Sequence, residues 1–444
     1  MRASLRNSTQ HRRLWFLACA SALNVAVVAT AATNSSAVYD RDPSHLWNRL
    51  FAAFYARQIE LVRREVAGAG NEHVERVHVG PDVPDPPLGR HPRFLLDDQP
   101  FDRCDRGLDE FLDQHGERLI DDPLRRVMLQ RDLWAVFDLL QAHPTQIQHG
   151  DMLEGGLPEP TAIQRERKET LSRKLARVMR ALAMPRDRIE SLPDPSGIDQ
   201  IVPDLSRALR RAGDGPWLEI VTDADGLFRH TRQVDGRSVF RVFCRWPHSA
   251  GGADGLRKWL RERSEPGVDL ARLPGAPPGA AFVLLRELLC IDDQLDIVPT
   301  RIVESVQVRR TAPSAQPPEA DVHGDVFTQE FAELSLRRSL LFAERASGLV
   351  PTGADGIYFD PYAVLGRVHT DSDGRMREGL PFPQTCLTCH SGRTLGGFAT
   401  MNASIMSLHS ARPLGRDEPS IAERVIRWKR EQPDFVRLRA LWSG

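Results

Sequence analysis

The residues with the clearest capacity for chemistry form one run near the carboxyl end of the chain, Cys386-Leu387-Thr388-Cys389-His390. C-x-x-C-H is the attachment sequence of a c-type haem. Two thiols three positions apart can bond the two vinyl groups on one edge of a porphyrin, and the adjacent imidazole then lies under the iron. The run therefore predicts a site for one covalent haem c.

Three other kinds of site use part of the same pattern. A zinc site needs about four ligands, usually in two separated pairs, and the chain has no second Cys pair. A thioredoxin-like C-x-x-C opens a helix after a strand, whereas Pro381-Phe382-Pro383 precedes this one. A disulfide between Cys386 and Cys389 is the purely structural alternative. Haem attachment is the favoured interpretation.

The segment Cys386-Leu387-Thr388-Cys389-His390-Ser391-Gly392 resembles the c-type cytochromes. Specific matching is confined to the motif and its flanks, within about the last hundred residues, and the upstream chain carries no motif of a known family. The resemblance implies that Cys386 and Cys389 form the haem thioethers and that His390 is an axial iron ligand. It also implies one-electron transfer, in which the iron alternates between the ferric and ferrous states.

The expected haem segment is shorter than a small soluble cytochrome. Turn residues dominate 361–385, where that fold has a helix before the motif. We therefore expect the haem to be completed by packing against the central β region. The expected wall residues are apolar and follow the motif, and Gly396-Gly397 would let the backbone approach the ring closely. They are Leu395, Phe398, Ile405 and Leu408, for which ordinary core packing is the equal alternative.

The sixth iron ligand can be reduced to a short set of candidates. Within reach in sequence are Met401, Met406, His409, Met376 and His369. A methionine raises the reduction potential and suits an electron carrier, whereas a second histidine lowers it. We favour a methionine over His409, with an open sixth position or an upstream ligand as the further alternatives.

Three classes of function are compatible with one covalent haem. The first is electron transfer to or from a redox partner protein that the sequence does not identify. The second is a haem enzyme of peroxidase type, in which an open sixth position binds peroxide. The third is a non-catalytic haem subunit or redox sensor whose upstream region binds a partner. Electron transfer is the favoured prediction, and an electron carrier is favoured over an enzyme.

The first residues of the chain have the pattern of an export signal. Four arginines precede the apolar run Leu14–Ala32, which ends in small residues, and Ala29-Thr30-Ala31 fits an A-x-A cleavage site. Cleavage would release a periplasmic protein, in the compartment where c-type haem is attached. The alternative is an uncleaved membrane anchor, because a run of nineteen residues can just span a bilayer, although Asn24 lies inside it.

Composition and charge narrow the classes of protein further. The chain has 59 Lys plus Arg against 60 Asp plus Glu, so its net charge is −1, which argues against nucleic-acid binding. With 41% hydrophobic residues it can bury a core. Cys104, Cys244 and Cys290 remain after the signal and the motif are set aside. They form either one disulfide plus a spare thiol or three separate buried thiols.

Apolar periodicity predicts helices and strands in different parts of the chain. Helical spacing predicts helices over 40–67, 122–140, 163–182 and 255–263. Alternating residues predict strands over three ranges, which are 217–221, 230–246 with a hairpin turn at Asp235-Gly236, and 281–309. Proline excludes a helix over 81–100. Residues 327–348 are expected to form a helix, with a strand at 334–342 as the alternative.

These elements predict an α+β protein with a mostly helical N-terminal part, a central antiparallel β region and a C-terminal irregular or helical haem c segment. We expect five segments. They are 1–31, a signal peptide; 32–100, a helix plus a proline-rich linker; 101–213, a helical domain; 214–320, a mixed β-rich domain; and 321–444, the haem c-binding domain.

Overall fold

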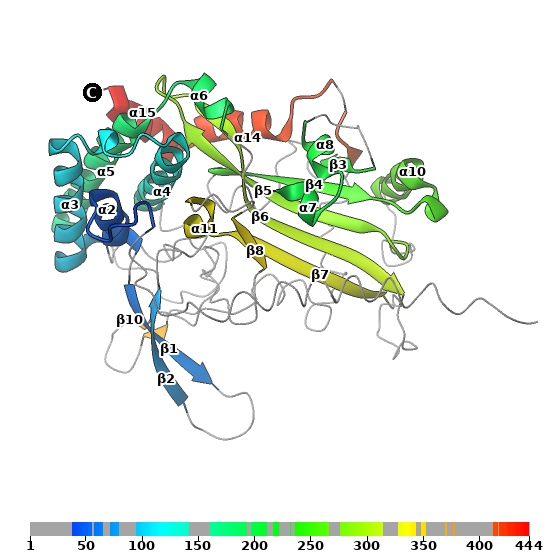
Figure 1. Ribbon diagram of the computed structural model, residues 1–444, viewed down its shortest axis with the longest axis horizontal. Helices are drawn as coiled ribbons and strands as arrows, with labels where there is room; N and C mark the ends of the chain where they lie inside the picture. The colour runs from blue at the N-terminus through cyan, green and yellow to red at the C-terminus, as the bar shows by residue number, and fades with distance from the viewer. Residues whose placement is uncertain are drawn as a thin grey trace, which may run out of the picture. The chain divides into compact units, whose positions relative to one another are not determined.

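In the computed structural model, the described residues combine helices with one large antiparallel sheet and confirm the α+β class (Figure 1). They belong to one unit, residues 36–444. The structure describes residues 38–55, 57–64, 72–79, 95–141, 160–192, 197–210, 216–221, 231, 236–265, 276–313, 327–342, 348–351, 369–370, 376–377, 412–415 and 417–443.

The described helices fall mainly before and after the sheet in the chain. The long ones are α2 (Leu46–Tyr55), α3 (Asp98–Asp113), α4 (Pro123–Gln141), α5 (Ala162–Leu182), α10 (Gly252–Ser264), α14 (Ile421–Arg430) and α15 (Pro433–Ser443). The short ones are α6 (Arg186–Glu190), α7 (Ile198–Ile201), α8 (Leu205–Arg210) and α11 (Arg338–Phe342), with single 3₁₀ turns at Gly116–Arg118 and His248–Ala250.

Local sequence signals explain where several of these helices begin and end. Asp122 precedes α4, and its Oδ1 accepts a hydrogen bond from the Leu124 amide at 2.8 Å. Thr161 and Gln164 form a reciprocal capping box at the start of α5, which ends before Pro185. Such caps satisfy amide groups that have no partner inside the first helical turn. The predicted helices over 122–140, 163–182 and 255–263 are confirmed.

Seven antiparallel strands form the sheet, in the order β11-β3-β4-β5-β6-β7-β8. Its strands are β3 (Leu218–Val221), β4 (Ser238–Arg245), β5 (Ala281–Ile291), β6 (Ile297–Pro313), β7 (Phe327–Leu336), β8 (Leu349–Pro351) and β11 (Arg412–Pro413). The predicted strands at 217–221 and 281–309 are confirmed. Of the hairpin at 230–246, the structure describes β4, while most of the first strand lies outside the described residues.

Two ranges predicted as helices are corrected. The helix expected over 40–67 ends at Tyr55 and is followed by strand β1 (Arg57–Arg64), which pairs with β2 (Glu72–Val79). The range 327–348 begins with strand β7, which pairs along β6 from Pro313 opposite Phe327 to Ser305 opposite Ser335. In both cases the strand pairs with another strand that lies outside the range of residues whose apolar spacing predicted the helix. Residues 98–100, the end of the range in which proline was expected to exclude a helix, also open α3, because Pro100 lies in the first turn, where proline is tolerated.

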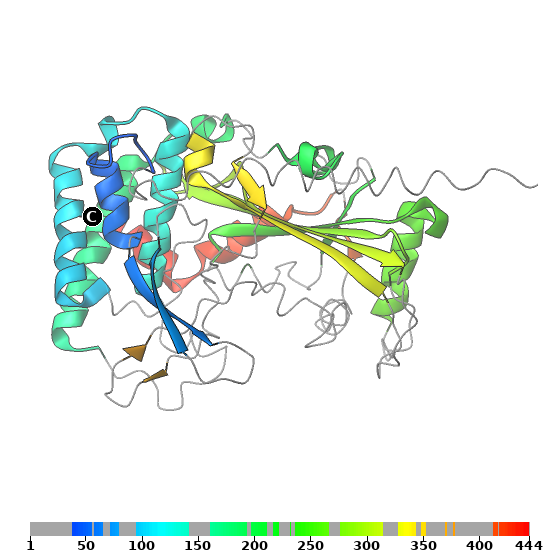
Figure 2. The same ribbon diagram turned by 60° about the horizontal axis from the view of Figure 1, so that its bottom comes forward.

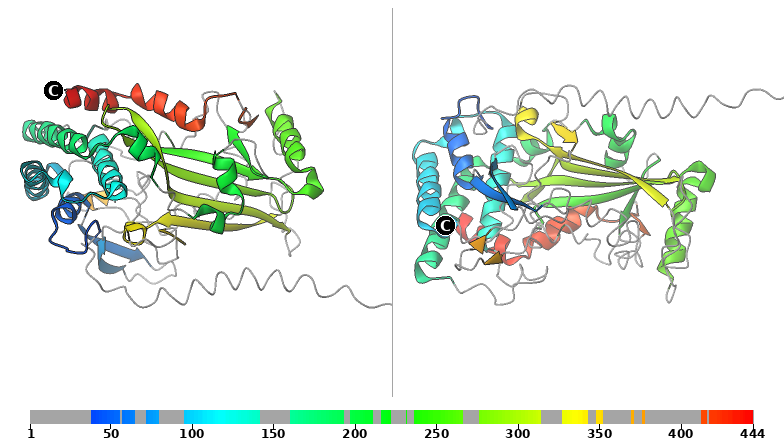
Figure 3. Two further views of the ribbon diagram at one scale, coloured as in Figure 1. Left: turned by 45° about the horizontal axis from the view of Figure 1, so that its top comes forward. Right: turned by 90° about the horizontal axis from the view of Figure 1, so that it is seen from below.

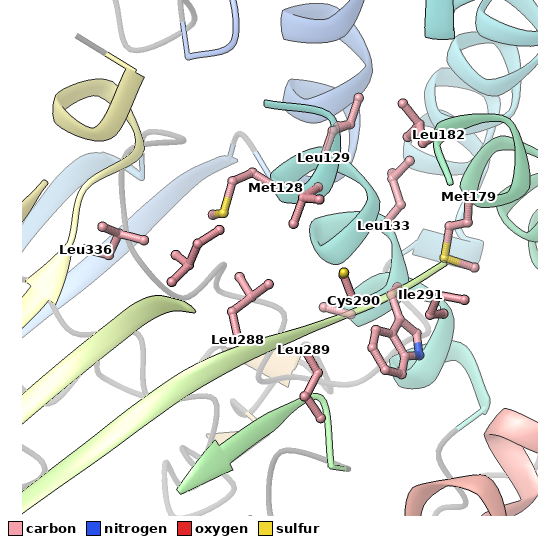
Figure 4. Packing of buried hydrophobic residues seen from close by; sticks show 14 of the residues in the cluster. Met128, Leu129, Leu133, Met179, Leu182, Leu288, Leu289, Cys290, Ile291 and Leu336 are labelled. Carbon is pink, nitrogen blue, oxygen red and sulfur yellow. The ribbon is translucent and has the colours of Figure 1, made fainter. Parts of the chain in front are cut away.

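The N-terminal helices pack at one end of the central strands, and α10 lies at the other (Figure 2). Apolar side chains join α4 and α5 to the end of β5 (Figure 4). From α4 come Met128, Leu129 and Leu133, from α5 come Met179 and Leu182, and from β5 come Leu288, Leu289, Cys290 and Ile291. Each fully buried aliphatic side chain of this kind stabilises a fold by about 1.5–3 kcal/mol.

Helix α4 is buried on all sides and still carries charged residues. Asp132 is fully buried and accepts hydrogen bonds from Arg338 of α11, of which the Nε bond measures 3.0 Å, and from the Tyr39 hydroxyl. Burial lowers the pKa of Arg338, but the Asp132 carboxylate outweighs this effect and raises it. Burial raises the pKa of Asp132, and the Arg338 guanidinium and the Tyr39 hydroxyl oppose this rise, so each member of the pair compensates the burial of the other.

We expect Arg338→Met to lower the free energy of unfolding by about 3–5 kcal/mol, because it leaves the Asp132 carboxylate buried without its cation. The matched control is Arg49→Met, which breaks an exposed ion pair with Glu110 and should cost less than about 1 kcal/mol. Urea denaturation followed by circular dichroism measures both. Equal losses in the two variants would contradict the role given to the buried pair.

Candidate functional site

Most of the predicted haem residues lie outside the described residues. These are Cys386, Cys389, His390, Met401, Met406 and His409, together with Leu395, Phe398, Ile405 and Leu408. His369 and Met376 fall in two short described strands, β9 (His369–Thr370) and β10 (Met376–Arg377). These strands pair antiparallel, with His369 opposite Arg377 and Met376 opposite Thr370.

The described strands fix where the chain enters and leaves the segment that carries the motif. Strand β8 ends at Pro351 at one edge of the sheet, and β11 begins at Arg412 at the opposite edge. Residues 352–411 therefore connect the two outermost strands. The motif is covalently tied to both edges of the sheet.

One face of the sheet combines an apolar centre with arginines. Phe240 and Val242 of β4 lie opposite Arg286 and Leu284 of β5. On β6, Gln307 and Arg309 lie opposite Leu284 and Phe282. Residues directly opposite in an antiparallel pair share a face. We call this surface the Phe240 face, defined by Phe240, Val242, Leu284, Arg286, Gln307 and Arg309.

Helix α10 covers one end of the Phe240 face (Figure 3). Its Leu256, Trp259 and Leu260 form a cluster with residues of β3, β4 and β5. Within that cluster the rings of Trp246 and Trp259 are 5.1 Å apart. The β-strand members of the cluster are Leu218, Ile220, Cys244 and Phe282.

At the other end, a buried carboxylate lies between two arginines. Glu304 Oε1 is 3.1 Å from Arg131 Nη2 of α4, and Glu304 Oε2 is 3.1 Å from Arg286 Nε. The Ser238 hydroxyl donates to Glu304 Oε2 at 2.7 Å. Burial alone would raise the pKa of Glu304, but Arg131, Arg286 and the Ser238 hydroxyl lower it to about 2. The carboxylate is therefore ionised, and it anchors Arg286 at the margin of the Phe240 face.

The centre of the Phe240 face is buried. Phe240 is 4% exposed and packs against the half-buried Val242 and Leu284. The Arg286 guanidinium lies 5.7 Å from the Phe240 ring centroid, a distance at which cations and aromatic rings attract. Arg309 is also 4% exposed. On this face apolar carbon and buried arginines lie side by side, and Arg286 is paired with Glu304.

The opposite face of the same strands belongs to the main core. Val239, Phe243, Val283, Leu285 and Val306 join the cluster that contains the N-terminal helices. The charged residue on that face is compensated there, because Arg241 binds Glu219 at 2.7 Å and Glu287 at 3.3 Å. Burial lowers the pKa of Arg241, and these two carboxylates together raise it well above its ordinary value.

The three remaining cysteines are buried in separate elements. Cys244 in β4 and Cys290 in β5 are free thiols, and burial raises the pKa of both. Cys104 in α3 donates from Sγ to the Ala53 carbonyl at 3.3 Å. Of the two alternatives drawn from the sequence, three separate buried cysteines is the confirmed one.

The sequence prediction missed the Phe240 face and the buried ion pairs. A signal was present, because Arg286 and Glu304 stand within strongly apolar strands, where a charge needs a buried partner. Within the described ranges, no group of three or more His, Cys, Asp or Glu residues could hold a metal ion. No helix in that part of the chain is long and apolar enough to cross a membrane.

Comparison with known proteins finds no match for this chain among family models, curated proteins or solved structures.

The buried cluster of Glu304, Arg131, Arg286 and Ser238, here called the Glu304 cluster, predicts a free energy of unfolding that depends on pH. Because the pKa of Glu304 is lowered from 4.5 to about 2 on folding, its contribution is present above about pH 4.5 and is lost as the pH falls toward 2. A shift of this size corresponds to about 3 kcal/mol. Glu304→Gln should therefore flatten the pH dependence of the free energy of unfolding between pH 4.5 and 2.

The matched control is Glu190→Gln, at an exposed position on α6, which should keep the wild-type slope. Urea titrations at several pH values measure the slope. If Glu304→Gln and the control show the same pH dependence, the carboxylate is not held ionised by its neighbours.

Proposed function

We propose that this chain is an exported c-type cytochrome-like protein that carries one covalent haem c and transfers single electrons to or from a redox partner protein. The observation that carries the proposal is the run Cys386-Leu387-Thr388-Cys389-His390. Export through the N-terminal signal would bring the chain to the periplasm, where such haem is attached.

Each proposed ligand has a separate role. Cys386 and Cys389 would hold the porphyrin through thioether bonds, and His390 would bind the iron. A methionine, Met401 or Met406, is favoured over His409 as the second iron ligand. When bound, haem supplies an iron that accepts and donates one electron. The protein sets the reduction potential through the ligand, the burial and the charges near it.

Covalent attachment makes a direct prediction. Protein matured in a strain able to attach c-type haem should keep haem-dependent peroxidase staining on a denaturing gel, because thioether bonds survive denaturation. Cys386→Ala with Cys389→Ala should abolish the stain. Cys244→Ala with Cys290→Ala is the matched control and should keep it, because these thiols lie in the core. Staining that survives the first double change would overturn the assignment.

The sixth ligand makes a second prediction. If a methionine completes the coordination, the ferric spectrum should show the sulfur-to-iron charge-transfer band at its red edge, and Met401→Ala with Met406→Ala should remove it. His409→Ala should leave it in place. Methionine ligation from this segment is wrong if the band is absent from the wild type or survives the double change. A five-coordinate, high-spin spectrum would instead support an enzyme of peroxidase type.

A further inference from the structure

We propose that residues 38–42 form an N-terminal strap that closes over the helical core and latches α11, so that docking or release of this end of the chain controls the helix that leads into edge strand β8. The residues that make this latch lie within the described part of the chain, and haem has no part in it. The latch adds a conformational device to the proposed function and does not rest on it.

The strap runs through the interior of the protein at its start. Val38 is 6% exposed and Tyr39 is fully buried. The Asn48 Oδ1 atom of α2 accepts hydrogen bonds from the Val38 amide at 3.0 Å and from the Tyr39 amide at 2.7 Å. Its Nδ2 atom donates to the Asp40 and Asp42 carbonyls at 2.8 and 2.7 Å. One buried side-chain amide thus satisfies four backbone groups and fixes the path of the strap.

Tyr39 joins the strap to α11 through three contacts. Its hydroxyl and the Arg338 guanidinium both donate to the Asp132 carboxylate. Its ring centroid lies 5.3 Å from that of Phe342. The Arg125 guanidinium donates to the Tyr39 carbonyl and, at 3.4 Å, to the Phe342 carbonyl. The strap therefore holds both the first and the last residue of α11.

Helix α11 is too short to keep its place without such contacts. It has 5 residues, whereas isolated helices shorter than about 12 residues are marginal in water. Burial and the Asp132 carboxylate raise the pKa of Tyr39, so its hydroxyl keeps its proton and serves as a donor. When the strap leaves, water can reach the ion pair of Asp132 and Arg338, and an ion pair in water contributes little to stability. Release of the strap should therefore release α11.

Helix α11 in turn sets the start of β8. The Arg337 amide, directly before α11, donates to the Gly348 carbonyl at 2.8 Å. Gly348 has a φ of +58°, and a Cβ atom there would lie 3.1 Å from the Leu341 Cα atom, so the helix and the residue before β8 are in close contact. Leu349 of β8 then pairs with Leu336 of β7. Because these contacts continue from α11 into β8, loss of α11 should also loosen the edge strand.

The strap follows closely on the predicted signal peptide. Residues 32–37 separate Ala31, the end of the A-x-A pattern, from Val38. Cleavage at that pattern leaves the strap intact, whereas removal of the chain through residue 42 would take the latch away. The position at which the N-terminal end is processed thus decides whether α11 is held.

Hydrogen exchange measured by mass spectrometry on the full chain tests the latch. Tyr39→Phe removes the hydroxyl that shares Asp132 with Arg338. The amides of α11 and β8 should then exchange at least about tenfold faster, because a hydrogen bond to a buried charge is lost. Asn48→Ala should also speed exchange in α11, because all the side-chain hydrogen bonds that Asn48 makes with described residues go to residues 38–42.

The wild type provides a measurement that needs no variant. If the strap and α11 open as one unit, the amides of residues 38–42 and of α11 should show the same dependence of exchange on urea. Protection of α11 that persists where the strap has already opened would overturn the latch.

The matched control is Tyr55→Phe. It removes another buried hydroxyl next to Asp132, but one that donates to the backbone carbonyl instead of the carboxylate, so exchange in α11 should stay at the wild-type rate. The amides of β5 and β6 should keep their protection in all three variants. Faster exchange in α11 from Tyr39→Phe alone, equal acceleration by Tyr55→Phe, or no acceleration at all would overturn the latch, as would loss of protection in β5 and β6 together with α11. Each of these results leaves covalent haem attachment standing.

Discussion

The structure depends on the charges that α4 carries into the protein interior. A buried charge without a partner costs several kcal/mol, so each charge on this helix fixes the position of another element. Asp132 holds Arg338 of α11, and Arg131 holds Glu304 of β6. Asp138 accepts from Lys429 of α14 at 2.8 Å and from Arg237 at 3.1 Å. Through these pairs one helix ties the strands to segments from the carboxyl end.

Uncharged hydrogen bonds from α4 also fix the position of a neighbouring element. The Gln130 side chain donates to the Ile291 carbonyl at 2.8 Å and accepts from the Ile291 amide at 2.9 Å, as a neighbouring strand would. This contact fixes the end of β5 on the helix. The Glu304 cluster then sets the position of Arg286 at the margin of the Phe240 face. The geometry of that face therefore follows from the interior of α4.

The sequence predicts the elements that depend on local signals. The predicted helices over 122–140 and 163–182 are confirmed, and in the structure Asp122 and Thr161 cap the first turns of α4 and α5. Residues 57–64 and 327–336 were expected to be helical but form strands, because each pairs with a strand outside the range whose apolar spacing predicted a helix. The covalent haem residues come from a motif that is contiguous in sequence. The Phe240 face is built from β4, β5 and β6, so only strand pairing reveals it.

Covalent haem attachment at the C-x-x-C-H run is the central claim. The most direct test is a reduced-minus-oxidised absorption spectrum of protein matured in a strain able to attach c-type haem, recorded after extraction with acidified acetone, which removes haem that is not covalently bound. We predict sharp α and β bands that correspond to one haem per chain. A featureless difference spectrum, from protein whose N-terminal signal has been cleaved, would contradict the claim.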